Sequence, residues 1–217
     1  MKTKFVIGLI ACGLMFNVAC EPGAQNDDPV EKATERTEQT GYIDDQTAEI
    51  LAETASLNMM NMELSRIAEE RAITPEVKQF AQQTTEVHDG INKELQALSQ
   101  KEPIVLPEQM SEDHVDKINN VADNEGIDFD KEYVDEIKNV YQDKIDEFEN
   151  LARDTENPEV QEFALSTLPK LRMQLETAER VEKQLDNNNN NNNNRAGEGE
   201  FERGSEQQKE RNDGSNI

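Results

Sequence analysis

His88 is the residue in the patterned part of the chain that is best suited to acid–base chemistry or metal binding, because an imidazole titrates near neutral pH. It follows Pro75 at almost the same separation in the sequence as Asn61 precedes that proline. In an antiparallel pair of helices, residues at equal distances from the turn face each other. Asn61 and His88 are therefore expected to point toward one another.

A second pair of polar residues has the same relation to a second proline. Tyr141 precedes Pro158 and Gln174 follows it, again at almost equal separations. All four positions fall within apolar stripes, and at a rise of about 1.5 Å per residue they should lie about 20–25 Å from the turns. The spacing predicts one inward-facing polar layer, made of Asn61, His88, Tyr141 and Gln174.

The elements that would position this layer are long amphipathic helices. Apolar residues recur at steps of three and four over four stretches, Leu57–Ile67, Val77–Leu98, Tyr133–Leu151 and Val160–Val181. This period indicates helices, and no stretch alternates with the period of a strand. A shorter stripe of Val115, Ile118 and Val121 predicts a small connecting helix. The pattern predicts an all-α fold of two helical hairpins, joined by a crossover that contains this short helix.

Capping signals mark the starts of three of these helices. Thr74-Pro75-Glu76 and Asn157-Pro158-Glu159 each place a cap, a first-turn proline and an acid in order, and Ser111 precedes the short helix. The stretch 74–81 is similar to the stretch 157–164, so the two hairpins have the form of a diverged duplication.

Four short stretches carry a resemblance to a known family: Glu76-Val77-Lys78-Gln79-Phe80-Ala81, His88 with Asn92 and Leu95, Phe129-Asp130 with Tyr133, and Leu168-Pro169 with Leu171. Over about residues 47 to 183 the chain resembles the bacterial DUF4142 proteins. The resemblance implies a four-helix, ferritin-like bundle. Because the family has no settled biochemical role, it implies a fold rather than an activity.

The resemblance also implies a Glu on the first helix and a His on each of three later helices, at the positions held here by Asn61, His88, Tyr141 and Gln174. A carboxylate and three imidazoles at one level could hold a transition metal. Only His88 is kept in this chain, and amides and a phenol are poor replacements. We therefore predict no metal, no cofactor and no catalytic residue, and expect a hydrogen-bonded layer that sets helix register. A ligand pocket is the alternative.

The N-terminus has the layout of a secretory signal. Two lysines precede an apolar run over residues 5–19, which is short for a membrane span. Cys20 follows a small residue, as in the lipobox of bacterial lipoproteins, although Asn17 stands where Leu is usual. Cys12 fits the local pattern better but leaves an apolar core of only seven residues, which is the bottom of the workable range. We expect Cys20 to carry lipid and to attach the protein to a membrane.

Composition divides the chain into four segments. We predict a signal peptide over 1–19, lipidated Cys20 with a disordered acidic tether over 20–45, a helical bundle over 46–186, and a disordered tail over 187–217 that begins with a run of Asn.

The net charge limits the partners that the protein can have. A formal charge of −25 opposes binding to nucleic acid. His114 lies in an acidic helix start and is expected at the surface. The sequence predicts a non-catalytic envelope lipoprotein, attached to the outer membrane and facing the periplasm or the cell surface, with a partner that the sequence does not identify. The alternative is a metal-binding or redox-active ferritin-like protein. A third hypothesis is an enzyme that uses His88 as its acid or base.

Overall fold

The computed structural model describes the backbone of residues 28–212 and the side chains of residues 28–187. This part of the chain forms six helices and no strand, which confirms the all-α prediction. The helices are α1 (Pro29–Glu38), α2 (Asp45–Arg71), α3 (Pro75–Lys101), α4 (Glu112–Ala122), α5 (Gly126–Asp154) and α6 (Pro158–Asn212). The predicted signal peptide and Cys20 lie outside the described residues.

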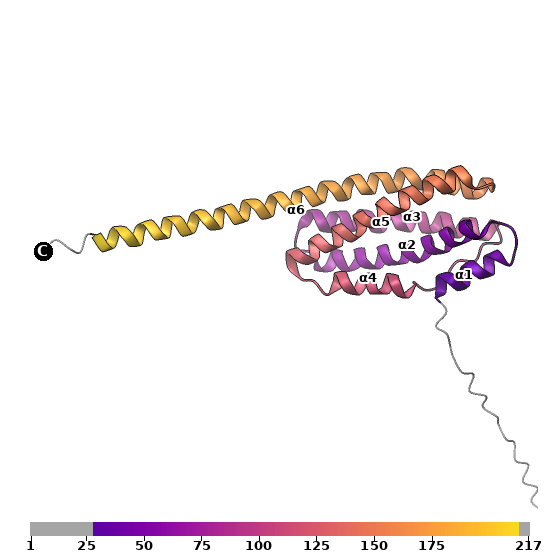
Figure 1. Ribbon diagram of the computed structural model, residues 1–217, viewed down its shortest axis with the longest axis horizontal. Coiled ribbons are helices and arrows are strands. Elements are labelled where there is room, and N and C mark those ends of the chain that lie inside the picture. The colour runs from indigo at the N-terminus through magenta and orange to yellow at the C-terminus, as the bar shows by residue number, and fades with distance from the viewer. Residues whose placement is uncertain (1–27, 213–217) are drawn as a thin grey trace, which may run out of the picture.

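The four longest helices pack in a closed order as a helical bundle. Helix α2 packs on α3, α3 on α6, α6 on α5, and α5 on α2. Helices α1 and α4 both pack on α2, and Figure 1 shows them along the same side of it. The segment that joins α3 to α5 contains α4, as the short apolar stripe predicted.

The core consists of the predicted apolar stripes. Phe80 and Tyr133 contact each other with ring centroids 5.9 Å apart, and Phe148 and Phe163 do so at 5.8 Å. Burying a side chain of this kind contributes about 1.5–3 kcal/mol. Both cysteines precede the described residues, so hydrophobic packing holds this part of the chain together without a disulfide.

The two hairpin turns differ in how their helix starts are capped. At the start of α6, the Asn157 side-chain oxygen accepts hydrogen bonds from the amides of Glu159 and Val160, at 2.9 and 3.1 Å. At the start of α3, the Thr74 side chain makes no capping bond, contrary to the prediction. Instead the buried Asp130 carboxylate of α5 accepts from the amide of Ile73 at 3.1 Å and from that of Thr74 at 2.8 Å.

The prediction of a disordered tether up to residue 45 is wrong for residues 29–38, which form α1. Ala33 and Thr37 are buried, and the Thr37 hydroxyl accepts a 2.9 Å hydrogen bond from the amide of Val105. Asp28 caps the helix through a 2.8 Å bond from the amide of Val30. The sequence signal was weak because the inward face of so short a helix holds few apolar residues.

The C-terminal segment also differs from its prediction. Helix α6 continues to Asn212 through the stretch predicted to be a disordered tail. Figure 1 shows this part extending past the other helices. Once a helix has begun, each further residue adds one backbone hydrogen bond without a new nucleation cost, so the backbone can extend α6 beyond its packed part.

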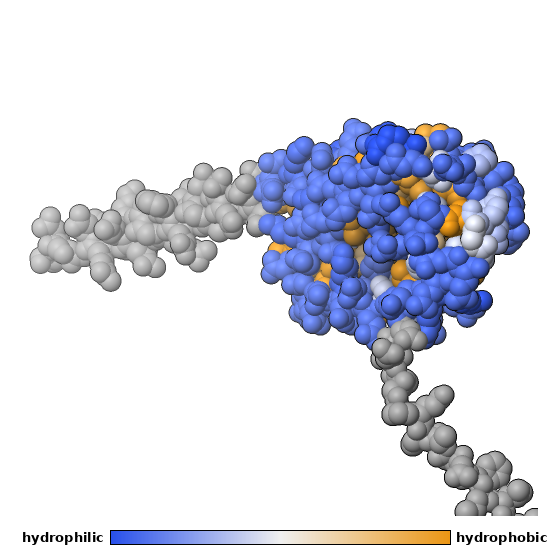
Figure 2. Space-filling view, turned by 45° about the vertical axis from the view of Figure 1, so that its right-hand side comes forward, coloured by the Kyte–Doolittle hydropathy of each residue, from blue (hydrophilic) through white to orange (hydrophobic). Residues whose placement is uncertain are grey.

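The surface of the bundle is mostly hydrophilic. On the face drawn in Figure 2, hydrophobic residues show only in small areas between hydrophilic ones. Among the described residues, no helix combines the length and the apolar character that crossing a membrane requires.

Replacing Asp130 with Ala should remove the acceptor for both amides at the α2–α3 turn. We expect the free energy of unfolding to fall by about 2 kcal/mol, since a carboxylate that accepts two amide hydrogen bonds is lost. Urea titration of both proteins measures the difference. The exposed Asp143→Ala variant is the control and should change stability by less than about 0.5 kcal/mol. Equal stability of the two variants would show that Asp130 does not hold this turn.

Candidate functional site

Three of the four predicted layer residues meet inside the bundle. The imidazole of His88 on α3 is buried, with its Nε2 atom 3.0 Å from Asn61 Nδ2 on α2 and 3.0 Å from the Tyr141 hydroxyl on α5. The Tyr141 ring stacks on the imidazole, with centroids 5.7 Å apart and planes 8° apart. The sequence did not predict a further partner, Asn58, whose Oδ1 atom lies 2.7 Å from His88 Nδ1.

Gln174 is buried but makes a different contact. Its side-chain amide donates a 3.1 Å hydrogen bond to the backbone carbonyl of Gln83 on α3. Gln174 therefore ties α6 to α3 and does not bond directly to His88.

With the Asn58 and Asn61 amides oriented as they are in the structure, the hydrogen bonds indicate a neutral His88. Because Asn58 Oδ1 can only accept, Nδ1 carries the proton and donates it. Nε2 then has one lone pair, toward which both the Asn61 amide and the Tyr141 hydroxyl point. Turning both amides would exchange donors and acceptors and would still leave the imidazole neutral.

Burial reinforces this neutral state. Desolvation lowers the pKa of His88 to about 3, because a charged imidazolium is disfavoured in the core. Burial also raises the pKa of the Tyr141 hydroxyl well above its ordinary value. The layer is therefore uncharged at neutral pH.

The layer contains more polar atoms than its hydrogen bonds use. Asn58 Nδ2, Asn61 Oδ1 and Thr84 Oγ1 are buried and have no hydrogen-bond partner among the described residues. The Thr84 hydroxyl does lie close enough to the Tyr133 and Tyr141 hydroxyls to offset part of the rise in their pKa. A buried polar atom without a partner costs about 1–3 kcal/mol, so the register that the layer sets is gained at a cost in stability.

The layer does not fit a transition metal. Its donors are one imidazole, two amides and a phenol that burial keeps protonated, and the Nε2 lone pair of His88 already accepts hydrogen bonds. Among the described residues, no group of three His, Cys, Asp or Glu side chains gathers in a way that could hold a metal ion.

A second polar cluster joins the crossover to α2, and sequence analysis missed it. His114 is buried, not at the surface as expected, and its Nδ1 atom lies 2.7 Å from the Ser56 hydroxyl. The Ser56 oxygen also accepts a 2.9 Å bond from the amide of Ser111. The Ser56 hydroxyl also lies 3.5 Å from the Ser111 hydroxyl, and burial is the chief cause that lowers the pKa of His114. A Ser–His pair can be a nucleophile and its base, but here both side chains are buried, and the contacts of Ser56 with Ser111 and His114 connect α2 to the start of α4.

A buried lysine lies in the same part of the bundle. Lys144 on α5 reaches Glu53 on α2 at 2.8 Å and Glu147 on its own helix at 2.6 Å. Its side chain is 6% exposed, so the two carboxylates balance a charge that is largely removed from water. In the sequence, Lys144, Glu53 and Glu147 do not differ from other charged residues of the helices. Lys144 is buried only because α5 packs on α2.

The neutral His88 should make stability depend on pH. In the unfolded chain its imidazole has a pKa of 6.5, whereas in the folded protein the value is about 3. Between these values the unfolded state binds more protons, so this contribution to stability is lost as the pH falls. When the pH is lowered from 6.5 to about 4.5, the free energy of unfolding of the wild type should fall by about 2 kcal/mol more than that of a His88→Gln variant, which has no titratable group at this position.

Urea titrations at several pH values measure this difference. Nitrogen-15 NMR of the imidazole gives an independent measurement, because the two ring nitrogens of a neutral histidine have distinct shifts. An imidazolium signal from folded protein at about pH 5 would contradict the assignment of a neutral His88.

Comparison with known proteins shows the family to which this chain belongs. A family model for a domain of unknown function, DUF4142, matches residues 32–181, which is more than half of the chain. No curated protein and no solved structure matches. The matched region begins within α1 and ends within α6, so it includes the polar layer and the crossover. The resemblance noted from the sequence is confirmed, and the chain belongs to the DUF4142 family.

Proposed function

We propose that this protein is a non-catalytic lipoprotein of the bacterial envelope that acts by binding. The observation that carries the proposal is the use of the His88 lone pair inside the bundle, where Asn61 and Tyr141 both point toward it. A general base must present its lone pair to a substrate. The other pair that resembles a catalytic dyad, Ser56 and His114, is buried, so neither side chain is open to a substrate.

The fold in this proposal is a ferritin-like four-helix bundle. Its support is the closed packing order of α2, α3, α6 and α5, and the crossover between the two hairpins. Both hairpins also bury the equivalent residues of the sequence repeat, namely Val77, Phe80 and Ala81 in α3 and Val160, Phe163 and Ala164 in α6.

The anchor in this proposal is a lipid on Cys20, on the outer membrane and facing the periplasm or the cell surface. Its support is the signal-like segment before Cys20. Helix α1 begins at Pro29, so a fully extended linker from Cys20 reaches at most about 30 Å. The bundle would therefore stay within a shorter maximum distance of the membrane than a tether that ends at residue 45 would permit.

Changing Cys20 to Ser should abolish lipid attachment. In cells fed an alkyne-labelled fatty acid, the wild type should be labelled and recovered with membranes, whereas Cys20→Ser should be neither. The matched control is Cys12→Ser, which should behave as the wild type does. Labelling that is lost in Cys12→Ser and kept in Cys20→Ser would place the anchor at the rival cysteine.

The competing function is metal or redox chemistry at the polar layer. Two buried oxygens without a partner in the described part of the chain, Asn61 Oδ1 and Thr84 Oγ1, favour it, while the other donors of the layer oppose it. Elemental analysis of the purified protein separates the two functions. We expect less than about half an equivalent of iron, manganese or zinc. A larger amount that is lost in His88→Ala and kept in the exposed-site control Asp143→Ala would overturn the non-catalytic proposal.

A further inference from the structure

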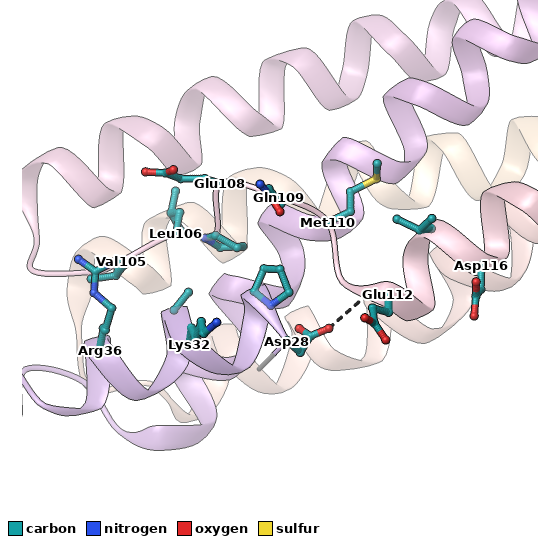
Figure 3. Close-up of a pocket in the computed structure, with 14 residues that line it drawn as sticks. Asp28, Lys32, Arg36, Val105, Leu106, Glu108, Gln109, Met110, Glu112 and Asp116 are labelled. Atoms are coloured by element: carbon teal, nitrogen blue, oxygen red, sulfur yellow. Dashed lines mark hydrogen bonds between the residues drawn. The ribbon is translucent and has the colours of Figure 1, made fainter. Parts of the chain in front are cut away.

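A groove lies between α1, the connection from α3 to α4, and the start of α4. Its volume is about 720 Å³, within the usual range for ligand sites. Figure 3 shows its walls, with α1 on one side and the connection on the other. Val105, Leu106 and Met110 of the connection are half-buried and give the groove an apolar surface.

Specific polar contacts hold the walls of the groove in place. Asp28 caps α1 and, through its other carboxylate oxygen, accepts a 3.3 Å hydrogen bond from the amide of Glu112 at the start of α4. Thr37 binds the backbone of Val105 from the opposite end of α1. The groove is therefore bounded by segments that are tied to each other at two points.

The groove has opposite charges at its two ends. Figure 3 shows Arg36 at one end and Asp116 at the other. Both side chains are exposed, and neither has a hydrogen-bond or ion-pair partner among residues 28–187. Figure 3 shows Lys32 and the exposed Glu108 on the Arg36 side of the groove. Asp28 and Glu112 lie toward Asp116, so the carboxylates predominate at the Asp116 end. The arrangement complements a ligand with an anionic group at one end, a cationic group at the other and an apolar part between them.

The length of the groove limits which zwitterion can reach both charges. The N-termini of α1 and α4 meet at the bond between Asp28 and Glu112. From Asp28, Arg36 is about 12 Å along α1, and from Glu112, Asp116 is about 6 Å along α4. Because the two helices run in opposite directions from this point in Figure 3, the Cα atoms of Arg36 and Asp116 lie on the order of 15–18 Å apart. A single amino acid or a phospholipid headgroup is shorter than this. An extended peptide gains about 3.4 Å per residue, so four or five residues span the distance.

We propose that this groove binds short peptides with free ends, with the C-terminal carboxylate at Arg36, the N-terminal ammonium at Asp116 and apolar side chains against Leu106 and Met110. The inference rests on the proposed binding role and is independent of the lipid anchor. Loss of peptide binding in vitro and loss of lipid labelling in cells are separate outcomes.

The test uses the chain from residue 20 onward carrying Cys20→Ser. The protein is mixed with a randomised library of pentapeptides that have free ends, and retained peptides are identified by mass spectrometry. The best peptide is then made in three forms: free, C-terminally amidated and N-terminally acetylated. Calorimetry should show that each blocked form binds the wild-type groove about tenfold more weakly than the free form.

Two variants test which residue of the groove binds each end of the peptide. Arg36→Gln should bind the free and amidated forms equally, and Asp116→Asn should bind the free and acetylated forms equally. The controls Lys183→Gln and Asp143→Asn remove exposed charges on α6 and α5, and should keep the wild-type pattern. All four substitutions are at exposed sites, and circular dichroism checks that the variants remain folded.

Three results would overturn the proposal. One is that no pentapeptide binds with a Kd below about 1 mM. Another is that blocking either end of the peptide weakens its binding to the wild type and to the variants by the same factor. The third is that phosphatidylethanolamine micelles, and no peptide, shift the NMR signals of Val105 and Met110, which would assign the groove to lipid headgroups.

Discussion

The single lone pair of the His88 Nε2 atom constrains how three helices of this bundle fit together. Asn61 on α2 and Tyr141 on α5 both point to it, so sliding either helix by one residue along α3 would leave buried polar atoms without a partner. Apolar contacts alone would tolerate such a shift far better, because they have no fixed direction. The same contacts occupy the imidazole nitrogen that a proton or a metal ion would otherwise bind.

Helix α2 is the element on which most of the others depend. It contacts α1, α3, α4 and α5, and its buried residues include serines, threonines and asparagines as well as apolar residues. Ser56 contacts His114 of the crossover, and Asn58 and Asn61 contact the imidazole of His88. The Ser65 hydroxyl lies 2.9 Å from the Tyr133 hydroxyl. Small polar residues allow close approach of neighbours on several sides, and each must be matched by a partner. The helix therefore contributes apolar residues to the core and also connects its neighbours through polar contacts.

The helical bundle and part of the polar layer could be predicted from the sequence, because the stripes have a helical period and the prolines mark both hairpin turns. The number of residues from each turn gives the level of a side chain within its hairpin. This count correctly predicted that Asn61 and His88 face each other. The same counting placed Tyr141 and Gln174 at one level, but only Tyr141 reaches His88, while Gln174 bonds to the backbone of Gln83. His114 and Lys144 could not be predicted as buried, because their partners Ser56 and Glu53 lie on another helix, far away in the sequence. Helix α1 was missed because Ala33 and Thr37 are too few to form a pattern.

The polar groups of the interior contact one another, whereas charged groups of the groove are exposed, and this difference favours the groove as a place where a ligand could bind. Around His88 the polar groups are turned toward one another and are removed from water, so a ligand would have to break existing bonds and lose its own hydration. At the groove, Arg36 and Asp116 are exposed and have no partner within residues 28–187, so a ligand gains contacts without disrupting the packing of α2 on its neighbours. The matched family region begins within α1, and it therefore includes one wall of the groove together with the bundle. A protein with this division can bind at its edge while the core that sets its register remains unchanged.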